Sequence, residues 1–410
     1  MSDNKNLLIG PFSQILTMDG LSSHGHLQDA DLTVLENTSV LVQSGTIKAL
    51  GDFSKLQAQA DEVHAISSPA VLLPGFIDVH THLCFAGSRA LEYSMRLAGK
   101  SYLEIASSGG GILSTVEKTR KASKEQLVHG ILQRAKKLLT WGVTTCEVKS
   151  GYGLSFESEI KMLEAITESS SQQAVDLIPT CLAAHFLPSE FANHQEYLKH
   201  LMVDLLPQLK KNKLSNRIDI FVEEGAFSPK DAYSYLVRAK ELGFHLCMHV
   251  DQFTRGGSLL AAELGALTAD HLEQSTMKDL HILSKGGVIP VVLPGASLGL
   301  GIDFAPAKKM LDCNLPLVIA SDWNPGSAPM GDLLTQAAVL AAAEKLTMAE
   351  TFAAITCRAA KALSFMDRGM IKEGCRADML IFSCKDYREI LYHQGLLKPV
   401  NVFVKGQGCL

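Results

Sequence analysis

Residues 71–82 read Val71-Leu72-Leu73-Pro74-Gly75-Phe76-Ile77-Asp78-Val79-His80-Thr81-His82, an apolar run that ends in two histidines separated by one residue. Side chains alternate faces along a β-strand, so His80 and His82 point to the same side, about 6.6 Å apart along the strand. Two imidazoles at that spacing can converge on one metal ion. The pair would also fit two structural histidines at a strand end, and the rest of the chain bears on that choice.

The chain between residues 70 and 330 alternates eight short β-rich runs with longer segments of helical period. Near-continuous apolar strands that alternate with helices predict an α/β protein built on a parallel (β/α)8 TIM barrel. An open doubly wound sheet is the alternative, but no Gly-x-Gly-x-x-Gly turn follows the first strand. The expected strands are residues 71–82, 144–152, 176–185, 218–224, 244–251, 266–272, 287–294 and 316–324. The clearest expected helices are residues 125–141, 157–169, 229–243 and 259–265.

The two ends of the chain differ from this pattern, because short strand-like pieces alternate there with Gly and polar residues. Neither end has enough apolar surface to fold well alone. We therefore expect residues 1–69 and 365–410 to pair into one small β-sandwich beside a barrel formed by residues 70–364. An Ala-rich helical stretch, residues 331–363, would close the barrel and lead back to the sandwich.

The composition is that of a globular protein, with 47% hydrophobic and 20% charged residues among 410. A net charge of -5 without a block of one sign argues against nucleic acid or an anionic membrane as the partner. The N-terminus lacks a signal-peptide pattern, and Pro290 and Pro294 interrupt the longest apolar stretch, residues 288–302. Nine scattered cysteines without a Cys-x-x-Cys pair fit free thiols in a reducing compartment, so we expect a cytoplasmic protein.

Chemistry in such a barrel sits at the carboxyl ends of the strands. Histidines, carboxylates and a lysine gather there, and His80, His82, His249 and Asp322 form a mixed nitrogen and oxygen set suited to one divalent ion, zinc or iron. His245 and His249 resemble the helical His-x-x-x-His of zinc proteases, but on a strand they lie about 13 Å apart. We expect His249 to be the ligand and His245 to pack inside the barrel.

A bound metal ion lowers the pKa of its water to about 7 and makes hydroxide available at neutral pH. Asp322 would bind the ion and accept the water proton, and His271 would hydrogen-bond the nucleophile or polarise the scissile carbonyl. Asp322 alone would also fit a turn, because Asn324-Pro325-Gly326 follows it.

This arrangement resembles the amidohydrolase superfamily, with His-x-His on strand one, His on strands five and six, and Asp on strand eight. Longer motifs resemble one of its families, the imidazolonepropionases, through the whole barrel. The most discriminating are Lys149-Ser150-Gly151-Tyr152-Gly153 and Asp322-Trp323-Asn324-Pro325-Gly326. The others are residues 85–89, 95–102, 109–112, 184–188 and 269–273.

The resemblance implies hydrolysis of the ring amide of 4-imidazolone-5-propanoate to N-formimidoyl-L-glutamate, a step of histidine degradation, by a homodimer. It implies that Arg89 binds the substrate propionate as a bidentate pair. It places Tyr152 and a catalytic His185 at the ring, and Ser327, Asn324 and the backbone of Gly326 at carboxylates. Tyr102 is a further substrate-binding candidate, and the glycines 109–111 are either backbone donors or a lid.

Gln252 stands three residues after His249, where deaminases of the superfamily have a proton-shuttling Glu. Glutamine donates and accepts hydrogen bonds but takes up no proton, so we expect Gln252 to recognise the ring amide. This disfavours the alternative enzyme, a heterocycle aminohydrolase. A metal-free scaffold protein is the non-enzymatic alternative, and the complete ligand set argues against it. Strand four lacks the lysine that bridges two metals in binuclear members, so we expect one ion.

Overall fold

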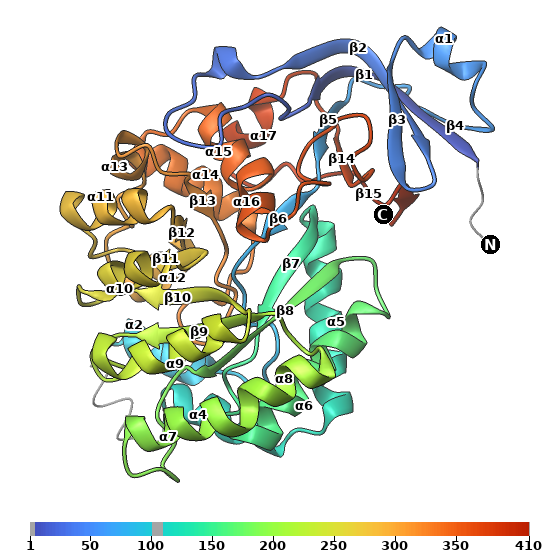
Figure 1. Ribbon diagram of the computed structural model, residues 1–410. Coiled ribbons are helices and arrows are strands. Elements are labelled where there is room, and N and C mark those ends of the chain that lie inside the picture. Colours follow the sequence, from blue (N-terminus) through green and yellow to red (C-terminus); the bar gives the residue numbers. More distant parts are fainter. Residues whose placement is uncertain (1–4, 101–109, 410) are drawn as a thin grey trace.

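The computed structural model describes residues 5–100 and 110–409, which form a barrel and a second sheet beside it (Figure 1). The barrel sheet has eight strands in sequence order, and every neighbouring pair is parallel. The predicted (β/α)8 barrel is confirmed. Its strands are β6 (Phe76–Asp78), β7 (Val143–Lys149), β8 (Asp176–Ala184), β9 (Arg217–Val222), β10 (His245–Val250), β11 (Thr268–His271), β12 (Ile289–Val292) and β13 (Val318–Ile319).

The barrel closes just beyond the ends of its first and last strands. The Asp322 N–H donates to the His80 carbonyl at 3.0 Å, and the His82 N–H donates to the Trp323 carbonyl at 3.0 Å. Thr81 and Trp323 form a parallel bridge between these two hydrogen bonds. Three of the candidate metal ligands, His80, His82 and Asp322, therefore supply backbone groups that close the barrel.

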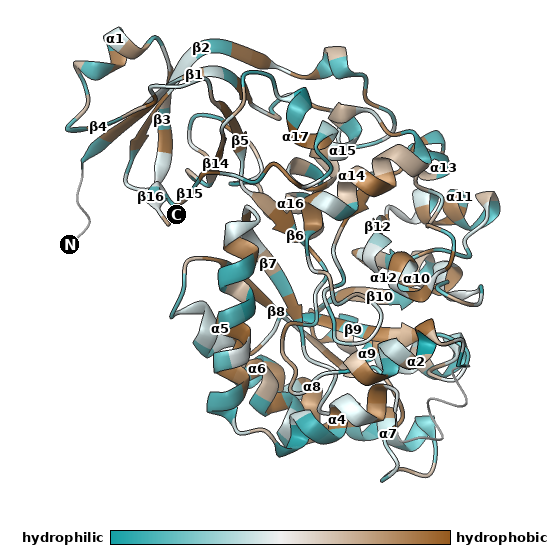
Figure 2. Cartoon of the chain, turned by 180° about the vertical axis from the view of Figure 1, so that it is seen from behind, coloured by the Kyte–Doolittle hydropathy of each residue, from teal (hydrophilic) through white to brown (hydrophobic). Residues whose placement is uncertain are grey.

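Helices cover the outside of the barrel, and several of them begin at local capping signals. Helix α5 (Lys124–Thr140) starts at a capping box in which the Ser123 side chain accepts from the Gln126 N–H and the Gln126 side chain reaches back. In Figure 2 much of strand β9 is brown, whereas α5 has teal stretches toward the outside. The other helices of the barrel are α2 (Ala90–Leu97), α4 (Ile112–Lys121), α6 (Phe156–Ser170), α7 (His194–His200), α8 (Leu206–Asn212), α9 (Pro229–Glu241), α10 (Gly257–Leu264), α11 (Met277–Gly286), α12 (Pro294–Leu300), α13 (Ala307–Asp312), α14 (Leu333–Glu344), α15 (Met348–Ala354) and α16 (Cys357–Ala362).

The two ends of the chain form a second, mixed sheet of eight strands, which confirms the predicted pairing of the termini. Residues from distant parts of this sheet, among them Ile47 and Phe403, belong to one buried apolar cluster, so the sheet folds over its own core. Its strands are β1 (Asn6–Leu16), β2 (Val34–Gln43), β3 (Thr46–Gly51), β4 (Glu62–Ala65), β5 (Val71–Pro74), β14 (Met379–Phe382), β15 (Asn401–Val404) and β16 (Gln407–Gly408). The short helices α1 (Phe53–Gln57) and α17 (Arg388–Tyr392) lie between these strands in the sequence.

The run 71–82 is not one barrel strand. Strand β5 pairs with β1 and β14 of the terminal sheet, and only β6 belongs to the barrel. The Gly75 N–H donates to the Asp378 carbonyl, whereas the next N–H, of Phe76, donates to the Gly142 carbonyl. Gly75 allows this passage because a Cβ there would lie 2.2 Å from the Thr144 hydroxyl oxygen.

The predicted burial of His245 is wrong, because this side chain is exposed. His245 is the first residue of β10, at the end of the barrel away from the site, where the strand has just left the loop after α9. The nine cysteines are all free, and eight of them are buried, in agreement with the sequence. None of the helices in the described chain is long and apolar enough to cross a membrane.

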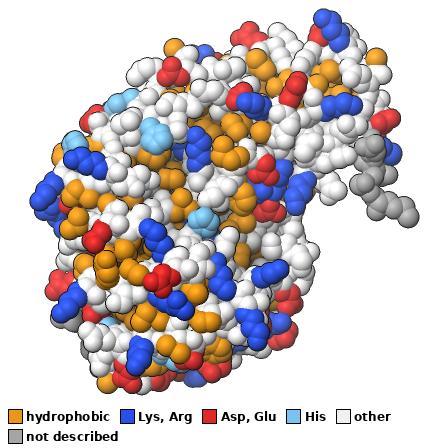
Figure 3. Space-filling view, viewed as in Figure 1, with side chains coloured by type: hydrophobic (Ala, Val, Ile, Leu, Met, Phe, Trp, Pro, Cys, Tyr) orange, Lys and Arg blue, Asp and Glu red, His pale blue; other side chains and the backbone are white. Residues whose placement is uncertain are grey.

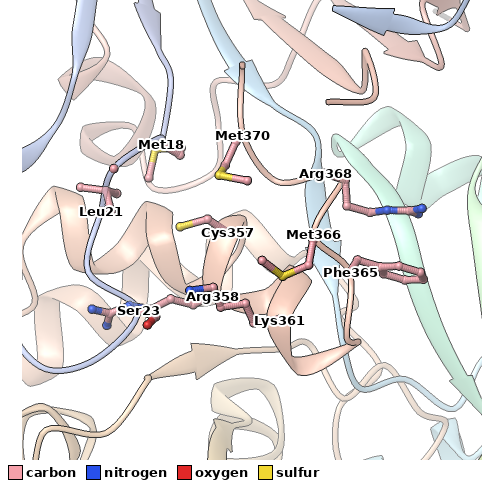
Figure 4. Close-up of a pocket in the computed structure, with 11 residues that line it drawn as sticks. Met18, Leu21, Ser23, Cys357, Arg358, Lys361, Phe365, Met366, Arg368 and Met370 are labelled. Atoms are coloured by element: carbon pink, nitrogen blue, oxygen red, sulfur yellow. The ribbon is translucent and has the colours of Figure 1, made fainter. Parts of the chain in front are cut away.

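A cavity of about 50 Å³ lies between the N-terminal segment and α16. Figure 4 shows the sulfur-bearing side chains of Met18, Cys357, Met366 and Met370 around it. Arg358 anchors this junction, because its guanidinium donates to the carbonyls of Ser22 and Gly25. The cavity therefore belongs to the contact between the two chain ends and the barrel.

Candidate metal centre and active site

His80 and His82 follow β6 directly, on the stretch that closes the barrel. Their Nε2 atoms are 3.3 Å apart, and both side chains are buried. His249, the fifth residue of β10, brings a third imidazole to the same place, and the ligand atoms of the three lie within 4.8 Å of one another. The structure therefore brings together the three histidines that the strand-end pattern selected.

Asp322 completes the group from beyond the end of β13. Its Oδ1 lies 3.3 Å from Nε2 of His82 and 3.6 Å from Nε2 of His80. Ligands that bind zinc at about 2.0–2.1 Å in a tetrahedron are about 3.3 Å apart. These donor separations therefore fit a single tetrahedral ion.

Two buried carboxylates lie behind the histidines. The Nδ1 atom of His80 is 2.6 Å from Oδ2 of Asp270, and that of His249 is 3.1 Å from Oδ1 of Asp219. With Nδ1 as the donor, Nε2 of each ring carries a lone pair directed into the centre. Converging lone pairs on buried atoms are the donor arrangement that a cation satisfies, so these residues fit a metal ion.

The environment keeps these imidazoles neutral, which is the form that binds metals. Burial lowers the pKa of His80 well below its usual value, and the neighbouring Lys149 acts in the same direction. Burial lowers the pKa of His249 to about 4, although Asp219 opposes the shift.

His271 ends β11 beside the metal ligands, with its ring centroid 5.3 Å from that of His249. Burial by itself lowers its pKa, but the carboxylates of Glu273, Asp322 and Asp270 together raise the pKa above the usual value. The Nδ1 atom of His271 lies 3.5 Å from Oε1 of Glu273, which also accepts from the Ser297 hydroxyl at 3.2 Å. His271 is therefore an imidazole that readily takes up a proton next to the candidate metal centre.

His185 and Tyr152 form one wall of the site. The His185 ring stacks on His82 with centroids 5.5 Å apart and an angle of 23° between the planes. Its Nδ1 is 2.9 Å from the Gly151 carbonyl oxygen, which leaves Nε2 as an acceptor. Tyr152 lies 5.5 Å from His185 and 5.8 Å from His82 between ring centroids.

A cationic end of the site lies beside Gly326. Arg89 is paired with Glu92 at 2.7 Å, and a Cβ on Gly326 would lie 2.3 Å from Nη1 of Arg89. Arg96 donates to the Gly326 carbonyl at 2.8 Å. Two guanidiniums therefore converge on one glycine, and in the described part of the chain Glu92 is the carboxylate paired with Arg89.

Asn324 builds the loop that carries Gly326 and Ser327. Its Oδ1 accepts from the N–H groups of both residues at 2.7 and 2.8 Å, and its Nδ2 donates to the Asp322 carbonyl at 2.7 Å. Both ends of this side chain are engaged within the loop. A direct contact of Asn324 or the Gly326 N–H with a carboxylate therefore requires rearrangement of these bonds and stays a prediction.

Of the remaining candidates, the structure describes some and not others. Gln252 is buried in the segment that follows β10, one residue after Asp251. Tyr102 and Gly109 lie outside the described residues. Reasoning from the sequence did not select the carboxylates behind the histidines, nor Glu92 and Arg96. Asp219 and Asp270 were detectable as polar residues inside otherwise apolar strands, which is rare without a partner.

The sequence signature of the amidohydrolase family matches residues 71–408. Among curated proteins, an imidazolonepropionase of Bdellovibrio bacteriovorus is 36% identical over 99% of this chain and 97% of its own length. An imidazolonepropionase of Bacillus mycoides is 37% identical over 96% of this chain and 94% of its own. The chain belongs to the imidazolonepropionase family of amidohydrolases.

Solved amidohydrolase structures share this fold. A zinc-bound adenosine deaminase from Xanthomonas campestris superposes with a TM-score of 0.73 at 20% identity, over 98% of this chain and 92% of its own. A guanine deaminase from C. acetobutylicum gives a TM-score of 0.68 at 14% identity, over 99% and 100%. At these identities the likeness is one of fold, and imidazolonepropionase membership comes from the full-length relatives.

Proposed function

We propose that this member of the imidazolonepropionase family hydrolyses 4-imidazolone-5-propanoate at one divalent metal ion held by His80, His82, His249 and Asp322. The observation that carries the proposal is the convergence of these side chains: the donor atoms of His80, His82 and Asp322 lie 3.3–3.6 Å apart, as around one tetrahedral ion, and a ring nitrogen of His249 lies within 4.8 Å of those of the two other histidines. The ion supplies Lewis-acid activation of water at neutral pH. Zinc and iron both suit this ligand set.

Asp322 and His271 carry the proton work in this mechanism. Burial would raise the pKa of Asp322, but the hydrogen bond with His82 and the charge of the neighbouring His271 hold it below the usual value, so the side chain is an ionised base. Asp322 takes the proton of the attacking water, whose oxygen bonds to the ring carbonyl carbon. His271 hydrogen-bonds the carbonyl oxygen as negative charge develops there. When the C–N bond breaks, the ring nitrogen receives the proton held by Asp322, and the carbonyl carbon becomes a carboxylic acid, which releases the second proton of the water to solvent and leaves the new carboxylate.

The other candidates orient the substrate. Arg89 binds the propionate, and Tyr152 and His185 hold the ring against the imidazoles. Gln252 recognises the amide, and Ser327 meets a carboxylate. Tyr102, Asn324 and Gly326 are further substrate contacts in this proposal. Separation of a cationic end from a neutral, histidine-lined end suits a molecule with one carboxylate and one uncharged ring.

One ion, not two, is proposed. A second group of possible ligands, Asp219, His249 and Asp270, also lies within 4.8 Å. The Lys149 ammonium already neutralises this group, because its Nζ is 2.8 Å from Asp219 and 3.7 Å from Asp270. A buried ammonium among those carboxylates repels a second cation.

We further propose a homodimer in the cytoplasm, the compartment that suits nine free cysteines. Light scattering of the purified protein tests the first statement, and a monomer would contradict it. Fractionation of the source cells tests the second.

The test of the activity is turnover of freshly generated 4-imidazolone-5-propanoate, followed as loss of ring absorbance with and without a chelator. We expect chelator-sensitive loss, with N-formimidoyl-L-glutamate as the product. Stoichiometric metal without turnover would refute the substrate. Turnover by protein stripped of metal would refute the role of the ion.

A further inference from the structure

Lys149 is the last residue of β7, and its side chain is 1% exposed inside the barrel. Its Nζ lies 2.7 Å from Oε1 of Glu147, 2.8 Å from Oδ2 of Asp219 and 3.7 Å from Oδ2 of Asp270. A buried charge is costly unless it is paired, and this ammonium has three carboxylates around it. The arrangement fixes the position of all four groups.

Two of these carboxylates have a second task. Asp219 contacts Lys149 through Oδ2 and His249 through Oδ1. Oδ2 of Asp270 lies near both Lys149 and His80. The Lys149 ammonium is thus linked to each of two imidazoles through one intervening carboxylate. These imidazoles come from different sides of the barrel, after β6 and on β10. The ammonium therefore holds one oxygen of the Asp219 carboxylate by an ion pair at 2.8 Å, while the other oxygen meets the imidazole of His249 at 3.1 Å.

The charge of Lys149 is secure in this environment. Burial alone would lower its pKa, but Asp219, Glu147 and Asp270 raise it well above the usual value. Removal of the ammonium would be costly, because the three carboxylates would then face one another in a dry interior without a neutralising charge. They would turn away or take up protons, and either change alters the hydrogen bonds that they accept from His80 and His249.

We propose that Lys149 is a positioning residue whose ammonium, through Asp219 and Asp270, fixes the imidazoles of His249 and His80 in the metal-binding arrangement. This inference rests on the metal site of the proposed function. It assigns no contact between Lys149 and the substrate. Lys149 therefore acts on the affinity for the ion.

The decisive comparison is the zinc affinity of metal-free full-length protein, measured by competition with a chromophoric chelator. The double variant Lys149→Met/Glu147→Gln removes one positive and one negative charge, and it leaves Asp219 and Asp270 in place. Glu147→Gln alone is the matched background. We expect the double variant to bind zinc about 10- to 100-fold more weakly than this background, the range found for partners of metal ligands.

Lys161→Met is the control for loss of a partly buried lysine. Its Nζ donates to the carbonyls of Arg120 at 2.9 Å and Ala122 at 2.7 Å, on the outside of the barrel. We expect this variant to lose stability while its zinc affinity stays within about threefold of wild type. An equal loss of zinc affinity in Lys161→Met and the double variant would overturn the inference.

Lys149→Arg keeps the charge and changes the geometry, so it remains informative if the double variant does not fold. We expect weaker zinc binding and a shifted visible spectrum of the Co²⁺-loaded protein. Wild-type affinity together with a wild-type spectrum would overturn the positioning role. If wild-type protein itself binds no stoichiometric zinc or cobalt, the proposed metal site fails, which is a different result from equal binding by wild type and variants.

Discussion

Gly326→Ala is the sharpest test of how the substrate carboxylate is bound. A Cβ at this position would lie 2.3 Å from Nη1 and 3.1 Å from Cζ of Arg89, where ordinary contacts are 3.4–4 Å. The guanidinium must therefore move by about 1 Å or more, and its pair with Glu92 must move with it. The substitution displaces Arg89 without touching any candidate metal ligand.

The size of the effect follows from the contact that is lost. A hydrogen bond to a charged group contributes about 1.5–3 kcal/mol. Loss of one such contact corresponds to a decrease of about 10- to 150-fold in kcat/KM. Because this binding energy is felt before the chemical step, we expect the decrease mainly as a higher KM. Steady-state kinetics on 4-imidazolone-5-propanoate, with metal content measured on the same samples, reports both quantities.

The mechanism of the effect is tested by a double-mutant cycle. Arg89→Ala removes the side chain that the new methyl group would strike, so Arg89→Ala/Gly326→Ala should be no worse than Arg89→Ala alone. Gly51→Ala is the control, because its Cβ would meet Leu56 at 3.7 Å, an ordinary contact. A further tenfold loss in the double variant, or an unchanged KM in Gly326→Ala, would refute the reasoning about Arg89.

Three more outcomes are expected. His249→Ala should lose the metal ion and the activity together, as measured by metal analysis and turnover; a metal-replete active variant would remove His249 from the ligand set. Asp322→Asn should lower kcat by about 10²- to 10⁴-fold with a smaller loss of metal, and full activity would exclude Asp322 as the base. Asp176 connects β8 to Arg368 at 2.8 Å and to Arg376; burial opposes ionisation, but both arginines hold its pKa below 3.8. A lowered folded-state pKa stabilises the protein above the unfolded value and loses that effect as the pH falls through the folded value. Asp176→Asn should therefore lower the free energy of unfolding by about 1–2 kcal/mol near pH 7 and by progressively less below pH 4, which denaturant titrations at both pH values will show.

The barrel was predictable because its strands are rich in apolar residues and are regularly spaced by helical segments. Expected helix 125–141 is α5, Lys124–Thr140, and expected strand 176–185 is β8, Asp176–Ala184. The division of the run 71–82 was not predictable from its hydropathy, since residues 71–73 and 76–77, on the two sides of the division, are all apolar. It depends on two successive N–H groups, of Gly75 and Phe76, that pair with carbonyls in different sheets.

The candidate site was predictable where the residue type itself carries the chemistry. Histidines and Asp322 at strand ends are conspicuous, and their ligand atoms do meet. Lys149 was visible at a strand end but had no interpretable role. Two of its three carboxylate partners, Asp219 and Asp270, lie 70 and 121 residues further along the chain. Pairings over such distances depend on the barrel register, which residue types alone do not determine.

Backbone conformation explains why the last step to the site needs the structure. Asp251, His271 and Asp322 all have positive φ angles, of 53°, 82° and 50°, and each lies at or just beyond the carboxyl end of its strand. Non-glycine residues adopt this region at a cost and persist there only where the surroundings over-determine them. At Asp322 two contacts hold the backbone. The Asp322 N–H donates to the His80 carbonyl, and the Asn324 side chain donates to the Asp322 carbonyl. Oδ1 of Asp322 lies 3.3 Å from His82 and 3.6 Å from His80, so the residues whose backbone groups close the barrel are also three of the candidate metal ligands.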